Sequence, residues 1–131
     1  MKYLCLVYQD EKELASLSQR ELDQRVDESL AVDEELQRSG RRIASDALQP
    51  VATATTVRVR NGKLSITDGP FAETKEQLGG YYLLECDSLD EAIEWAAKIP
   101  GAASGAVEVR PVMNYDAVSG EDSQRSAAAQ S

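Results

Sequence analysis

The stretch Asp68–Glu85, DGPFAETKEQLGGYYLLE, joins a turn-rich loop to the most apolar strand candidate in the chain. Its first three residues combine an Asp that can bond to its own backbone, a Gly that accepts positive φ and a Pro that fixes φ. A polar run that can form one short helical turn follows and ends at two glycines, after which Tyr81–Leu84 reads as a strand. Because alternate strand residues point to opposite sides, this strand is apolar on both faces. We therefore expect both of its faces to be covered.

A second strand candidate, Lys2–Tyr8, is also apolar on both faces. After a charged loop, Ser18 and Glu21 form a capping box, in which a hydroxyl and a carboxylate bond the free amides at a helix start. A moderately apolar stripe follows, made of Leu22, Val26, Leu30 and Asp33 and flanked by Leu36. Because a Gly after the last helical residue favours a helix end, Gly40 completes the pattern. The pattern predicts a helix from about Gln19 to Ser39.

Turn and capping signals place the remaining elements. Asn61-Gly62 is a strong hairpin signal between two β-rich runs. Ser88 and Glu91 form a second capping box before a helix whose expected inward residues are Leu89, Ala92, Ile93 and Ala96, with Trp95 beside them. The expected strands cover 41–48, 53–60, 63–67, 79–86 and 106–113. Residues 116–131 are poor in large apolar side chains, so we expect one domain over 1–115 and a disordered tail.

The order of elements predicts an α+β fold. It reads β-α-β, hairpin, β-α-β, which is a ferredoxin-like split βαβ with an inserted β-hairpin. In this topology the first and third main strands are central, and these are the two candidates with two apolar faces. Right-handed crossovers place both helices on one face of the sheet. A second sheet is therefore expected to cover the other face, and a homodimer is the natural solution.

The sequence also resembles the DGPF-type proteins of the YCII-related family. The resemblance lies in the start, MKYLCLVYQDE, in the middle, ALQPVATATTVRVRNGKLSITDGPFAETKEQLGGYYLLE, and in the end, DEAIEWAAKIPGAASGAVEVRP. It covers roughly Met1 to Met113 and implies a ferredoxin-like fold that pairs into a dimeric α/β barrel. Related barrels include muconolactone isomerase-like and dehydrochlorinase-like enzymes, and DGPF-type domains also occur with sigma-factor-like regulators. In the broader family a His and an Asp are proposed to act together, whereas this chain contains no His.

Composition excludes several classes of function. The formal net charge is −9, which disfavours direct binding to a nucleic-acid backbone. We expect no membrane span, no signal peptide and a cytoplasmic location, because no run of about 18 apolar residues and no basic-then-apolar leader is seen. The two cysteines, Cys5 and Cys86, lie in apolar strand candidates and are expected to be buried thiols. With no His and no metal-ligand spacing, we expect no metal and no cofactor.

Candidate site residues lie around the two central strands and the loop at Asp68. Asp68 is a general base if it is half-buried beside the ring of Phe71, and otherwise only closes a turn. Arg110 suits a carboxylate or phosphate ligand, with Glu108 beside it, although such a pair is also typical of a solvated edge strand. Tyr8, Tyr81 and Tyr82 either orient a ligand or fill an interface. The cluster of Glu73, Lys75 and Glu76 is more typical of a solvated surface.

Three hypotheses about function follow from these residues. The favoured one is a small dimeric domain that binds a small organic ligand, such as an organic acid, or serves a regulatory protein partner. The alternative is a cofactor-free isomerase- or dehydrochlorinase-like enzyme with Asp68 as its acid and base. The third is a purely structural dimer. Because proton transfer near neutral pH most often uses His, the lack of His favours binding over catalysis.

Overall fold

The computed structural model describes residues 1–115, so the predicted tail lies outside the described residues. Its body is a four-stranded sheet in the order β2-β5-β1-β6, and every neighbouring pair is antiparallel. The strands are β1 (Lys2–Gln9), β2 (Arg42–Ala47), β5 (Gln77–Glu85) and β6 (Ala106–Pro111). The two strands with two apolar faces, β1 and β5, are the central ones. The α+β, ferredoxin-like prediction is therefore confirmed.

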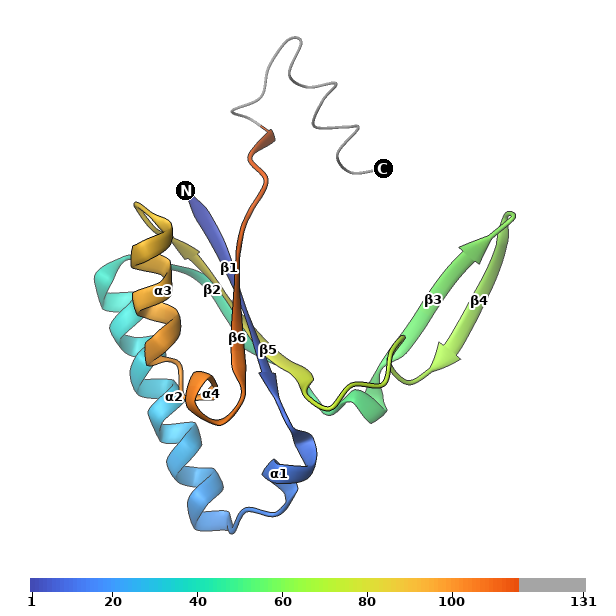
Figure 1. The fold of residues 1–131 in the computed structure, drawn as a ribbon, viewed down its shortest axis with the longest axis horizontal. Coiled ribbons are helices and arrows are strands. Elements are labelled where there is room, and N and C mark those ends of the chain that lie inside the picture. The colour runs from blue at the N-terminus through green and yellow to red at the C-terminus, as the bar shows by residue number, and fades with distance from the viewer. Residues whose placement is uncertain (116–131) are drawn as a thin grey trace.

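The two long helices, α2 (Gln19–Ser39) and α3 (Leu89–Lys98), lie on one side of the sheet (Figure 1). The capping box at the start of α2 is present, and Gly40 ends the helix with a left-handed φ of 75°. Three short elements connect the larger ones: α1 (Glu11–Ala15), the 3-10 turn η1 (Val51–Thr53) and α4 (Gly101–Ser104). None of the described helices combines the length and the apolar character that crossing a membrane requires.

The predicted hairpin forms a separate two-stranded sheet, β3 (Thr55–Arg60) and β4 (Lys63–Asp68). We call residues 55–68 the arm, because they project away from the body of the molecule (Figure 1). Its tip is the expected Asn61-Gly62 turn, in which the two residues have φ values of 54° and 75°. At its base, the amide of Gly69 donates to the carbonyl of Ala54 at 2.7 Å.

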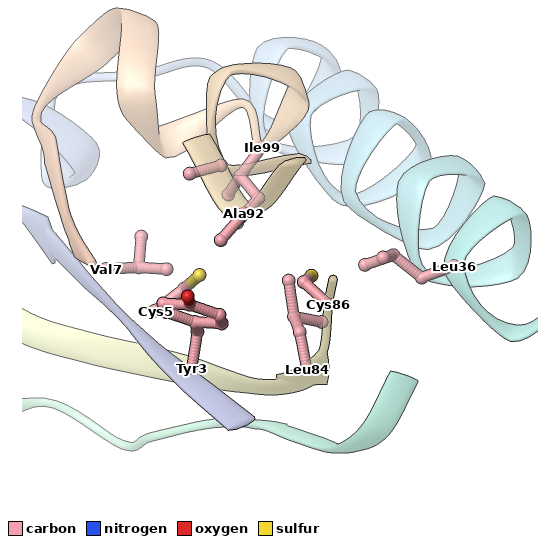
Figure 2. Packing of buried hydrophobic residues seen from close by; sticks show 9 residues of the cluster. Tyr3, Cys5, Val7, Leu36, Leu84, Cys86, Ala92 and Ile99 are labelled. Atoms are coloured by element: carbon pink, nitrogen blue, oxygen red, sulfur yellow. The ribbon is translucent and has the colours of Figure 1, made fainter. Parts of the chain in front are cut away.

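The core lies between the helices and one face of the sheet. Figure 2 shows side chains of β1, including Cys5, and Leu84 of β5 pointing toward Leu36 of α2 and toward α3. Leu36 and Leu84 are fully buried, as are both thiols. Burial and the neighbouring Cys86 raise the pKa of Cys5 to about 11. The prediction of buried, free cysteines is therefore confirmed.

The other face of the sheet is open in a single chain. Strand register places alternate residues of β1, β5 and β6 on it. They are Leu4, Leu6, Tyr8, Tyr81, Leu83, Glu108 and Arg110. Within residues 1–115, no helix covers this face (Figure 1). The face is the one for which the sequence predicts a second sheet.

Several local predictions were wrong. The charged segment after β1 forms α1, because the side chain of Asp10 caps it by accepting from the amide of Lys12 at 2.9 Å. The polar run before β5 forms no helix, and β5 begins at Gln77. The capping box of α3 is incomplete, because the carboxylate of Glu91 accepts from the amide of Asp87 at 2.7 Å.

The buried face of α3 also differs from the predicted one. Ala92 and Ala96 are buried as expected, but Leu89 and Ile93 are exposed. Ile99, which follows the helix, and Trp95 pack against the core instead. Small alanine side chains let α3 approach the sheet closely, and the larger side chains of Trp95 and Ile99 complete the contact.

Candidate ligand site

A cavity of about 500 Å³ lies between the first half of α2 and the helix-facing side of the sheet. It exists because Leu36 is the only fully buried residue of α2, so the earlier turns of the helix do not reach the sheet. Two glycines of β5, Gly79 and Gly80, form part of its wall and contribute no side chains to fill it. Its apolar lining includes Val7, Leu14, Leu22, Val26, Leu30 and Ile99. A concave, mainly apolar space of this size is typical of a small-molecule site.

A connected polar cluster forms one end of the cavity. Nε of Arg42 lies 2.8 Å from Oδ1 of Asp33, and the hydroxyl of Ser45 donates to the same oxygen at 2.7 Å. The side chain of Gln37 donates to Oδ2 of Asp33 at 2.8 Å. Burial alone would raise the pKa of Asp33, but hydrogen bonds from Ser45 and Gln37 and the charge of Arg42 outweigh it and lower the pKa. Asp33 is therefore an ionised carboxylate with both of its oxygens engaged by donors.

Tyr82 stands beside this cluster. In the strand register Tyr82 lies opposite Cys5 of β1 and Ser45 of β2. Because directly opposite residues point to the same face and Cys5 lies in the core, Tyr82 is on the helix-facing side of the sheet. Burial, followed by the negative charge of Asp33, raises its pKa, so the phenol stays protonated. Among residues 1–115, its hydroxyl has no hydrogen-bond partner. Tyr82 thus presents a hydrogen-bond donor and acceptor to the cavity.

A second ion pair lies at the wall formed by α1 and α2. The guanidinium of Arg25 donates to both oxygens of Glu13, at 2.7 Å and 3.1 Å. The hydrogen bond from Arg25 to this carboxylate raises the pKa of the guanidinium. Both arginines that line the cavity are therefore neutralised by carboxylates of the same chain.

The predicted site residues do not form one site. Only two of them, Tyr81 and Tyr82, line the cavity. Tyr8, Glu108 and Arg110 lie on the open face of the sheet, where Arg110 forms an ion pair with Glu108 that raises the pKa of the guanidinium. Asp68 ends the exposed strand β4, and Phe71 is 78% exposed. The expected shielding of Asp68 by Phe71 is absent from the single chain.

Sequence reasoning missed most of the polar cluster. Asp33 carried the available signal, because it interrupts an otherwise apolar helical stripe that also holds Leu30. A charged residue on an inward stripe requires a partner. Arg42 and Ser45 supply it from the adjacent strand β2, which sequence reasoning identified only as a mixed edge strand.

The fold and the cavity define a ferredoxin-like domain with a small-molecule-sized space under its first long helix. The model of the YCII-related domain matches residues 1–116, and the chain belongs to this family. An uncharacterized protein of Rhizobium meliloti (strain 1021) is 42% identical over 118 residues, which is 88% of this chain and 94% of that protein.

A solved structure has a similar fold at low sequence identity. It is 5-chloro-2-hydroxyhydroquinone dehydrochlorinase from Burkholderia phenoliruptrix AC1100, in complex with 2,5-dihydroxybenzoquinone. The TM-score is 0.47 at 14% identity, over 87% of this chain and 95% of that chain.

The ionised Asp33 predicts a specific dependence of stability on pH. Its pKa is lower in the folded state, so its stabilising contribution is present above about pH 4 and is lost as pH falls through the folded pKa. Asp33→Asn should lower the free energy of unfolding by about 1 kcal/mol at pH 7, because the ion pair is partly exposed. The difference from wild type should shrink in urea titrations below about pH 4. The control Asp27→Asn, on the exposed side of α2, should not change the free energy of unfolding at either pH. An equal loss of stability in that variant would contradict the stabilising role given to ionised Asp33.

Proposed function

We propose that this protein binds a small, uncharged organic molecule in the cavity between α2 and the sheet. The observation that supports this most directly is the hydroxyl of Tyr82, a half-buried donor beside a polar cluster whose own charges are already paired. A ligand with one or two polar oxygens can bond this hydroxyl while its apolar part contacts Val26, Leu30 and Ile99. The role is that of a binding or accessory module.

The paired charges favour a neutral ligand over the organic acid suggested by the sequence. An anionic ligand would compete with Asp33 for Arg42 and with Glu13 for Arg25. Breaking either pair would leave a carboxylate with reduced hydration near the new negative charge, which is costly. A phenol, a quinone or a cyclic ketone or alcohol avoids that cost.

The polar cluster supports binding better than acid–base catalysis. A carboxylate with a lowered pKa is a weak base, and the three groups bonded to Asp33 leave it poorly placed to accept a proton. The alternative, an isomerase- or dehydrochlorinase-like enzyme with Asp68 as acid and base, requires another chain to enclose Asp68. Within one chain Asp68 lies on the arm, whereas the cavity is lined by the body of the molecule.

A homodimer through the open sheet face is part of the same proposal. Leu4, Leu6 and Leu83 form an apolar centre there, and a second sheet packed face to face would cover them. A regulatory protein is the other partner that the family resemblance suggests. The buried free thiols fit a reducing, cytoplasmic setting.

Ligand binding is tested by a thermal-shift screen of small cyclic phenols, quinones, ketones and alcohols, with carboxylate analogues included. Each hit is titrated against wild type, Tyr82→Phe and Tyr8→Phe. Tyr8 is the matched control, because it lies on the open face of the sheet and does not line the cavity. Loss of the Tyr82 hydroxyl should weaken binding about threefold to tenfold, and loss of the Tyr8 hydroxyl should not.

A blocking variant makes the location of the site testable. Ser29 lines the cavity from α2, so Ser29→Phe should fill the space and abolish binding. A hit that binds this variant as tightly as wild type would place the ligand elsewhere. A screen in which no neutral compound stabilises the wild-type protein would overturn the proposed function.

The homodimer is tested by sedimentation velocity at micromolar concentration. Leu6→Glu places a charge at the centre of the open face and should convert a wild-type dimer into a monomer. Ala97→Glu places the same charge on the exposed side of α3, away from this face and from the arm, and is a control for charge alone. A wild-type protein that sediments as a monomer would contradict the assembly.

A further inference from the structure

The arm is amphipathic. In its register Val57 pairs with Ile66 and Val59 with Leu64, and paired residues of antiparallel strands point to the same side. These four aliphatic side chains therefore form one face, and each is between 58% and 63% exposed. The opposite face carries three basic residues, Arg58, Arg60 and Lys63. We call the first of these surfaces the aliphatic face of the arm.

Within residues 1–115, nothing covers the aliphatic face. The arm is a sheet of its own and extends away from the helices and the main sheet (Figure 1). Its base is fixed by the bond between Gly69 and Ala54 and by the hydroxyl of Thr56, which donates to the carbonyl of Gly69 at 2.8 Å. A free two-stranded hairpin is at most marginally stable in water, so an arm of this composition gains stability from a surface outside its own chain.

The body of the same protein carries an unpaired surface of matching chemistry. Leu22, Val26 and Leu30 line the cavity on α2, yet Val26 is 56% exposed and Leu30 is 61% exposed, so the stripe is open to solvent. The net charges of α2 and the arm are also opposite in sign. Helix α2 contains seven acidic and three basic residues, whereas the arm contains three basic residues and one acidic residue. The basic arm therefore complements the acidic helix. The open sheet face is a poorer electrostatic match, because its charged residues Glu108 and Arg110 already neutralise each other.

We propose that the arm of one chain docks on α2 of a second copy, with its aliphatic face on the stripe of Leu22, Val26 and Leu30. The docked arm forms an outer wall of the cavity. In a two-fold dimer the contact is reciprocal, so each chain completes the site of the other and the assembly closes. This inference rests on the proposed homodimer and on the proposed ligand cavity. It adds that the arm is the segment of the partner that completes the cavity.

Two neighbouring substitutions on β4 test whether the aliphatic face is an interface. Ile66→Glu places a charge on that face, and Ser65→Glu places the same charge on the opposite face. The arm contributes nothing to the buried core, so both variants should fold like wild type. Ile66→Glu should raise the dimer dissociation constant tenfold or more in analytical ultracentrifugation, and should weaken binding of a ligand found in the screen. Ser65→Glu should change the dissociation constant less than threefold.

Cysteine cross-linking tests where the arm docks. A chain with Val59→Cys is mixed with a chain of different mass that carries Val26→Cys, and the mixture is oxidised after subunit exchange. The native thiols are buried, so the introduced cysteines are the accessible ones. The mixed disulfide should form at least tenfold faster than with Glu28→Cys, which lies on the exposed side of the same helix.

The outcomes separate the two proposals. A monomeric wild-type protein overturns the homodimer, and with it the docked arm. A wild-type dimer that tolerates Ile66→Glu, or that cross-links equally at Val26→Cys and Glu28→Cys, overturns only the docking of the arm on α2. Ligand binding that is unchanged in a monomeric Ile66→Glu protein shows that the cavity is complete within one chain and overturns the shared site.

Discussion

Leu84→Ala is expected to lower the free energy of unfolding by about 3 to 5 kcal/mol. Leu84 is fully buried at the centre of the core, where it packs between the sheet and the helices (Figure 2). Removing its side chain loses buried apolar area and leaves a void that the surrounding strands and helices cannot close. The loss is measured by urea denaturation followed by far-ultraviolet circular dichroism.

The matched control is the neighbouring residue on β5. Leu83 is of the same type, but it points to the open face and is only partly buried in the single chain. Leu83→Ala should cost about 1 kcal/mol in the single chain, since less of its surface is removed from water on folding. Both variants are compared at low protein concentration, because assembly adds apparent stability. Equal losses would mean that the two faces of β5 are wrongly assigned.

Gly105→Ala is expected to cost about 3 kcal/mol, at the upper end for overpacked sites. A Cβ at this position would lie 2.1 Å from the carbonyl oxygen of Tyr8, a backbone atom that cannot rotate away. Relief requires β1 and the start of β6 to move apart, which would disturb the pairing of Tyr8 with Ala106. Thermal or urea denaturation measures the loss, and amide exchange in β6 shows where it falls.

Gly79→Ala is the control for this substitution. The nearest atom to a Cβ there is Oε1 of Gln9 at 3.6 Å, which is an ordinary contact. Its effect on stability should stay within about 1 kcal/mol. A Gly105→Ala protein as stable as wild type would show that the approach of the α4–β6 junction to β1 is looser than the structure indicates.

The sequence predicted the elements whose signals are local and strong. Helix α2 follows the predicted bounds because Ser18, Glu21 and Gly40 specify its ends by hydrogen bonds and a left-handed φ. The arm follows from the Asn61-Gly62 turn. The short helices α1 and α4 were not predicted, since each is only 4 or 5 residues long and too short to show a helical period.

The site was harder to predict because it depends on packing between distant segments. Period-two alternation separates Tyr81 from Tyr82 correctly. It does not tell which of the two faces has a cavity, because that depends on how far α2 stands from the sheet. Nor does the sequence reveal that Arg42 lies beside Asp33, since the two residues come together only when α2 packs on β2. Asp68 and Phe71 are both exposed in the single chain, and their enclosure in one site stays a prediction about the assembly.

The central position of β1 has a consequence for synthesis of the chain. β1 pairs only with β5 and β6 in the sheet, and its register runs as far as Pro111. A strand apolar on both faces is therefore made before both of its partners and stays unpaired until they follow. Such distant pairing slows folding and prolongs the exposure of aggregation-prone segments. Newly made chains are therefore expected to be prone to aggregation until β6 adds to the free edge of β1.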